Sequence, residues 1–89
     1  MEKRVITNES IYKTREMLDL ALQAMHAEML ANMQERRAKI KEDEDFVDSA
    51  EYGVLILRYH ELYMDIQEFK KTYDSLGKWL KRRQEEGII

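Results

Sequence analysis

The segment Tyr52–Leu80, with the sequence YGVLILRYHELYMDIQEFKKTYDSLGKWL, decides the fold. Its large apolar residues follow one another at alternating spacings of three and four: Tyr52, Leu55, Tyr59, Leu62, Ile66, Phe69, Tyr73, Leu76 and Leu80. This is the heptad pattern of a helix that packs along a neighbouring helix with a slight left-handed supercoil. It predicts one long helix that continues through Gly77. The alternative is a break at Asp74-Ser75, which would give a third short C-terminal helix.

The first half of the chain supplies a matching apolar stripe: Ile11, Leu18, Leu22, Met25, Met29, Met33 and Ile40. Only the acidic run KEDEDFVDS, residues 41–49, separates the two patterns. A link this short joins helices that lie antiparallel to each other. We therefore predict an all-α fold in one domain, 1–89, built as a long antiparallel helical hairpin. Helix 1 is expected at about 8–41, an acidic turn at 42–47 and helix 2 at about 48–86.

Capping residues agree with these limits. Thr7 or Asn8 can accept from the free N–H groups of the first helix, and Asp48 with Glu51 matches a capping box for the second. Each helix ends in a cluster of basic residues, which suits the negative end of the helix dipole. Gly87 then stands where a left-handed cap forms most easily, with Ile88 placed for the closing apolar contact.

Composition limits the possible classes of protein. Eighty-nine residues make one small domain, and such a chain buries only roughly 60–65% of its unfolded surface, so burial against a partner would add stability. The chain has no cysteine, a net charge of −3 and no 18-residue apolar run. We therefore expect no disulfide and no membrane association, and a cytoplasmic location. The net charge gives no general attraction to nucleic acid.

A second apolar line runs along helix 1, about 120° or more from the first: Met17, Leu20, Ala24, Ala31 and Ala38. It passes through LALQAMHAEMLANM, residues 20–33, which contain a single formal charge. Helix 2 has a surplus of its own in Ile56 and Tyr63. One antiparallel neighbour covers one stripe only, so we predict a homodimeric four-helix bundle or a higher helical oligomer. The alternative is a monomeric hairpin or three-helix bundle, in which the alanines reflect helix propensity alone.

Catalytic and metal-binding patterns are missing from the sequence. His60-Glu61 resembles the start of a zinc-protease helix, but position 64 is Met, so the second ligand is absent. The run Met25, Met29 and Met33 could offer thioethers to Cu(I), but it coincides with the core stripe, and packing is the preferred interpretation. The acidic run lacks the glycine and final glutamate of a Ca²⁺-binding loop. We expect a protein that is not an enzyme and that uses no cofactor or metal.

The polar segment with the clearest binding potential is GKWLKRRQ, residues 77–84. Its candidate binding residues are Lys78, Trp79, Arg82 and Arg83. In a hairpin they meet the start of helix 1, which brings four more basic residues near: Lys3, Arg4, Lys13 and Arg15. A tryptophan beside arginines can stack on a base or anchor an acidic partner. The structural alternative, which we prefer, is that Trp79 packs on Val5-Ile6.

These features favour a small non-catalytic interaction protein, such as an adaptor, regulator or inhibitor. It would act by binding another macromolecule, most simply another protein, while assembled as a homo-oligomer. The alternative function is a phosphate-ligand binder that uses the basic, Trp79-containing end for nucleic acid or a nucleotide.

Overall fold

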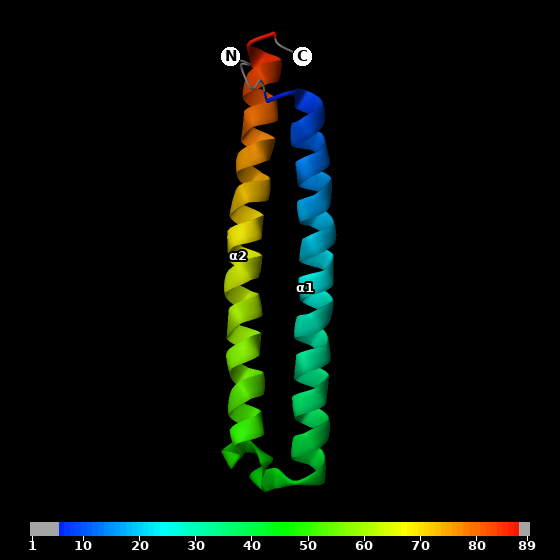
Figure 1. Ribbon diagram of the computed structural model, residues 1–89, viewed down its shortest axis with the longest axis vertical. Coiled ribbons are helices and arrows are strands. Elements are labelled where there is room, and N and C mark those ends of the chain that lie inside the picture. The colour runs from blue at the N-terminus through cyan, green and yellow to red at the C-terminus, as the bar shows by residue number, and fades with distance from the viewer. Residues whose placement is uncertain (1–5, 88–89) are drawn as a thin grey trace, which may run out of the picture.

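The computed structural model describes residues 6–87, which form two long helices joined by a short one (Figure 1). Helix α1 spans Asn8–Glu42, the 3₁₀ helix η1 spans Glu44–Asp48 and α2 spans Ala50–Glu85; within the described residues there is no β-strand. The two long helices lie antiparallel, so the start of α1 and the end of α2 are at the same end. The predicted all-α helical hairpin is confirmed. Helix α2 is continuous, so no third C-terminal helix forms.

The helix ends follow from side-chain capping. The Thr7 hydroxyl accepts from the backbone N–H of Ser10 at 3.1 Å, as predicted for α1. At α2 the prediction was wrong: the cap is Ser49, whose hydroxyl accepts from the N–H of Tyr52 at 3.1 Å. Asp48 cannot take that place because it ends η1, which occupies most of the expected acidic turn.

The C-terminal end of α2 reaches Glu85, with Glu86 as its cap. Gly87 adopts a positive φ of 75°, as predicted for a left-handed residue after a helix. The expected closing contact by Ile88 falls outside the described residues.

All nine residues of the α2 stripe are buried or half-buried, and so are all seven of the α1 stripe. The most completely buried apolar residues are Ile11, Phe46, Leu62, Ile66 and Leu80. Phe46 comes from η1 and packs edge-to-face against Tyr52, with ring centroids 5.8 Å apart. The core is therefore one line between two helices, closed at the connecting end by an aromatic pair.

The face of α1 that contacts α2 also contains polar residues at heptad positions. We call the full series the inner seam: Ile11, Arg15, Leu18, Leu22, Met25, Met29, Asn32, Arg36 and Lys39. None of these residues is exposed, although four are polar or charged. The apolar pattern of the sequence did not indicate them, because only their spacing marks them as members of the seam.

Two of the polar seam residues form a connected pair. The side-chain amide of Asn32, which is 6% exposed, donates to the backbone carbonyl of Leu55 at 2.9 Å. The Nε of Arg36 donates to Asn32 Oδ1 at 2.8 Å, and its guanidinium lies 5.0 Å from the ring centroid of Tyr59. A buried polar side chain of this kind fixes the register of a helix pair, because any shift leaves it without partners.

Lys39 and Arg15 are accommodated in different ways. The ammonium of Lys39 pairs with Glu51 and Glu35, and the hydrogen bond to Glu51 raises the pKa of Lys39 above its ordinary value. The Arg15 guanidinium lies 4.1 Å from the ring centroid of Tyr73. A Cβ atom added to Gly77 would come within 3.2 Å of Arg15 Nη2. Gly77 therefore leaves space for a charged side chain inside the seam.

This packing predicts that Gly77→Ala and Arg15→Ala are coupled. In the Arg15→Ala background, Gly77→Ala should raise the free energy of unfolding by about 1 kcal/mol, the ordinary preference for alanine over glycine in a helix. In the native background the gain should be clearly smaller, because Arg15 must move. Urea unfolding followed by circular dichroism measures both values. Gly53→Ala is the matched control, since a Cβ at that position would have no atom within 4 Å apart from its chain neighbours and the backbone of its own helix. An equal gain in both backgrounds would contradict the packing.

Candidate functional site

The second apolar line of α1 forms an exposed heptad series, which we call the outer seam. Its members are Met17, Leu20, Ala24, Ala27, Ala31, Gln34 and Ala38. All seven are exposed. At 100° per residue, the outer seam lies roughly 150° around α1 from the inner seam. It therefore points away from α2, and no described part of the chain covers it.

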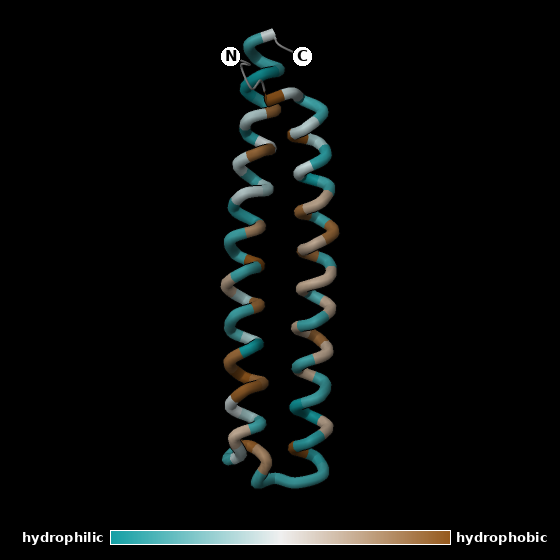
Figure 2. Tube along the Cα trace, in the orientation of Figure 1, coloured by the Kyte–Doolittle hydropathy of each residue, from teal (hydrophilic) through white to brown (hydrophobic). Residues whose placement is uncertain are grey.

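The outer seam exposes substantial apolar surface. Met17 is 70% exposed and Leu20 is 59% exposed, although both are large aliphatic side chains. Figure 2 shows hydrophobic colours on the outer edge of α1 as well as on the edge that faces α2. Small residues follow these two large ones along the helix, so a second helix could approach closely over the alanines.

The other two predicted interface residues lie on a different face. Tyr63 is 50% exposed and Ile56 is half-buried, and both lie roughly 90° around α2 from its stripe. The outer seam points almost directly away from α2 instead. The structure thus places four predicted interface residues, Met17, Leu20, Ala24 and Ala31, on one surface and separates them from Ile56 and Tyr63.

Charged residues border the outer seam on both sides. On one side, Glu28 pairs with Arg58 of α2 at 3.4 Å and Glu35 with Lys39 at 3.7 Å. On the other side lie Glu16 near the start of the seam and Arg37 near its end. Within residues 6–87, Glu16 and Arg37 form no ion pair, and both are exposed. They remain available to a neighbouring chain.

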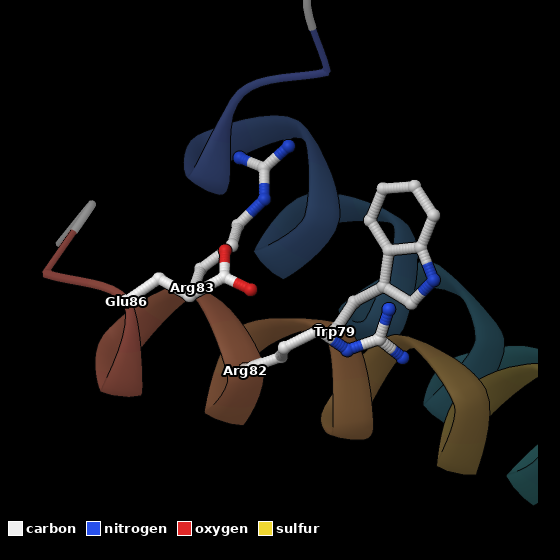
Figure 3. A pocket seen from close by; sticks show the side chains of 4 residues that line it. All are labelled: Trp79, Arg82, Arg83 and Glu86. Carbon is white, nitrogen blue, oxygen red and sulfur yellow. The ribbon is translucent and has the colours of Figure 1, made fainter.

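The basic end of the hairpin contains a cavity of about 260 Å³ lined by Trp79, Arg82, Arg83 and Glu86 (Figure 3). Trp79 is 41% exposed, and the Arg83 guanidinium lies 5.8 Å from its ring centroid. Figure 3 shows Arg83 extending toward the first turn of α1, where its Nη1 donates to Asn8 Oδ1 at 2.9 Å. Arg83 is therefore already engaged in holding the two helix ends together.

The remaining basic residues do not gather around this cavity as the sequence suggested. Lys78 is exposed and does not line it, Lys13 pairs with Glu9 at 3.1 Å, and Arg15 lies within the inner seam. Lys3, Arg4 and Val5 fall outside the described residues, so the predicted packing of Trp79 on Val5-Ile6 concerns a segment that is only partly described. Ile6 itself is 48% exposed.

Comparison of the chain with protein-family models, with curated proteins and with solved structures finds no match. Within residues 6–87, no group of three or more histidine and carboxylate side chains could hold a metal ion. Neither long helix in that part of the chain has a segment apolar enough to cross a membrane.

The contact between Arg83 and Asn8 predicts an effect on the local stability of α1. Arg83→Ala should increase hydrogen exchange of the amides in the first turns of α1, because it removes a hydrogen bond that joins these turns to α2. Arg82→Ala is the control, since Arg82 is exposed and makes no hydrogen bond to α1. Equal exchange in both variants would show that Arg83 does not hold the helix ends together.

Proposed function

We propose that the protein is a small non-catalytic interaction protein that assembles with copies of itself through the outer seam of α1. In this assembly it acts as an adaptor, regulator or inhibitor by binding another macromolecule. The observation that carries the proposal is a second heptad series, all of whose members are exposed, on the side of α1 that faces away from α2. Heptad spacing favours packing against another helix along the whole length of the series.

The dimensions of the hairpin support this proposal. Its principal extents are 61 × 27 × 15 Å, so it is a single layer of two helices. A domain normally buries its apolar faces between at least two packed layers. Among residues 6–87, only five apolar residues are buried, and three of them belong to α2. A second chain on the outer seam would add buried surface where Met17 and Leu20 are now exposed.

The proposal predicts that replacing both Ala24 and Ala31 with Glu dissociates the assembly. Glutamate is nearly as good a helix former as alanine, so each hairpin should keep most of its helicity. In the assembly, however, the two changes place charges and long side chains in a close helix contact, at a cost of several kcal/mol. Light scattering should show the mass of the variant falling toward that of one chain, 10.7 kDa, while circular dichroism stays largely helical.

Gln67→Glu with Gln84→Glu is the matched control. It adds the same two negative charges at exposed positions of α2, away from the outer seam, and should leave the assembly intact. If the variant with both Ala24→Glu and Ala31→Glu stays assembled, the contact between chains lies elsewhere, and Ile56 and Tyr63 are the next candidates. A native protein that is already a monomer would refute self-assembly. Complete unfolding of the variant would assign Ala24 and Ala31 to the core of a single chain.

A second candidate function, binding of a phosphate ligand such as a nucleotide or nucleic acid, is favoured by the cavity beside Trp79. Arg82 supplies an exposed cation and the indole a stacking surface. Two contacts oppose it: the Glu86 carboxylate lines the same cavity, and Arg83 is bonded to Asn8. These reduce the attraction that the cavity offers to an anion.

Fluorescence of Trp79, the only tryptophan, separates the two functions. We expect that nucleotides and single-stranded DNA change it only at low salt, because nonspecific electrostatic attraction is screened at physiological ionic strength. A change that persists at physiological salt and is lost in Arg82→Ala would establish the phosphate-binding function. Lys71→Ala, an exposed substitution that is remote from the cavity, is the control for loss of a positive charge.

A further inference from the structure

We infer that the partner on the outer seam is a second copy of this chain whose α1 lies antiparallel, with Leu20 opposite Ala31 of the partner copy. This inference rests on the proposed self-assembly and adds its orientation and register. Two independent features of the seam carry it: the order of large and small residues, and the charges at its border.

The order of residue sizes favours the antiparallel arrangement. Met17 and Leu20 occupy one end of the outer seam, and Ala24, Ala27, Ala31 and Ala38 follow. A parallel pair would place Met17 and Leu20 against their own copies at one end and mostly alanines against alanines along the rest, interrupted by Gln34 against Gln34, so the spacing between the helices would be uneven. An antiparallel pair with Leu20 against Ala31 also brings Ala24 against Ala27 and Met17 against Gln34. Leu20 then meets a small side chain and Met17 meets Gln34, so no two large aliphatic side chains oppose each other and the helices are more evenly spaced than in the parallel pair.

The border charges select the same orientation. Glu16 and Arg37 precede Met17 and Ala38, so both lie on one flank of the seam, 21 residues apart. In the antiparallel register this flank meets its own copy, and Glu16 of each chain lies beside Arg37 of the partner copy. The two-fold symmetry produces this pair twice. In a parallel pair, Glu16 would instead lie beside Ala21 of the other chain and Arg37 beside Glu42, so only the antiparallel pair gives both border charges a partner of opposite sign. Border charges of this kind set the orientation of paired helices.

The opposite flank is compatible with this register. Its carboxylates, Glu28 and Glu35, are already paired with Arg58 and Lys39 of their own chain. The antiparallel register places Glu28 beside Ala21 of the partner copy and Glu35 beside Thr14. No carboxylate then meets a carboxylate across the contact.

Engineered cysteines test the register, because the chain has no native cysteine. The double variant Leu20→Cys with Ala31→Cys should form a disulfide-linked dimer under mild oxidation, since the two positions face each other across the contact. Each single variant should remain unlinked. Positions 20 and 31 are 11 residues apart, so a cysteine and its own copy would be separated by about 16 Å along the axis, beyond the reach of a disulfide. Light scattering on the reduced proteins first confirms that each variant is assembled.

The outcomes distinguish this inference from the proposed function. Linked dimers in the single variants would show a parallel contact and overturn the inference, while self-assembly would stand. An assembled double variant that does not link would refute this register. A monomeric native protein would overturn both.

Charge exchange tests the orientation without a covalent bond. Glu16→Arg alone and Arg37→Glu alone should each weaken the dimer roughly ten-fold at low salt, because each replaces two attractive pairs with two repulsive ones. The two changes combined should restore native affinity, since the pairs are only reversed. Sedimentation velocity over a dilution series measures these constants. Additive weakening in the combined variant would show that Glu16 and Arg37 do not meet.

Discussion

The coverage of α1 is the constraint on which the other features of this molecule depend. The helix carries heptad series on two nearly opposite sides, and one antiparallel neighbour can cover only one of them. Helix α2 covers the inner seam over its full length, so the outer seam faces outward for geometric reasons that no adjustment of the hairpin can remove. The outer seam of such a chain lies either in water or against another helix. Exposure to water is costly in free energy because Met17 and Leu20, both large aliphatic side chains, are more than half exposed.

The inner seam stabilises a specific pairing of the two helices as well as a compact one. Its polar residues would be costly in water-free surroundings without partners. Asn32 donates to the backbone of α2 and accepts from Arg36, while Arg15 lies over Tyr73 in the space beside Gly77. A shift of one turn would separate these groups from their partners and place a side chain against Arg15. The seam therefore specifies one register for the hairpin, and this fixes the direction in which the outer seam points.

The elements predicted from sequence were those whose signal is apolar and periodic. The α2 stripe was complete because all its members are aromatic or aliphatic. Gly87 was identified, and Thr7 was one of two cap candidates, because few residue types suit these positions. The prediction failed at Asp48, since nothing in the acidic run indicated a 3₁₀ helix that moves the cap to Ser49.

The sequence pattern also assigned Arg15 to the basic end of the hairpin, whereas this residue lies within the inner seam. Long polar side chains cover apolar neighbours with their stems, so hydropathy conceals them as seam members. Residue types suggested Trp79, Arg82 and Arg83 as candidate binding residues, but the cavity that they line and the contact between Arg83 and Asn8 depend on the three-dimensional arrangement.

We propose that one chain does not complete the packing of α1. Sedimentation equilibrium of the unmodified protein at several concentrations, with circular dichroism on the same samples, tests it most directly. Self-assembly through the outer seam predicts a mass of at least twice the 10.7 kDa chain at micromolar concentration, with a thermal unfolding midpoint that rises with protein concentration. A mass of one chain at every concentration, with full helicity and an unfolding midpoint independent of concentration, would contradict it.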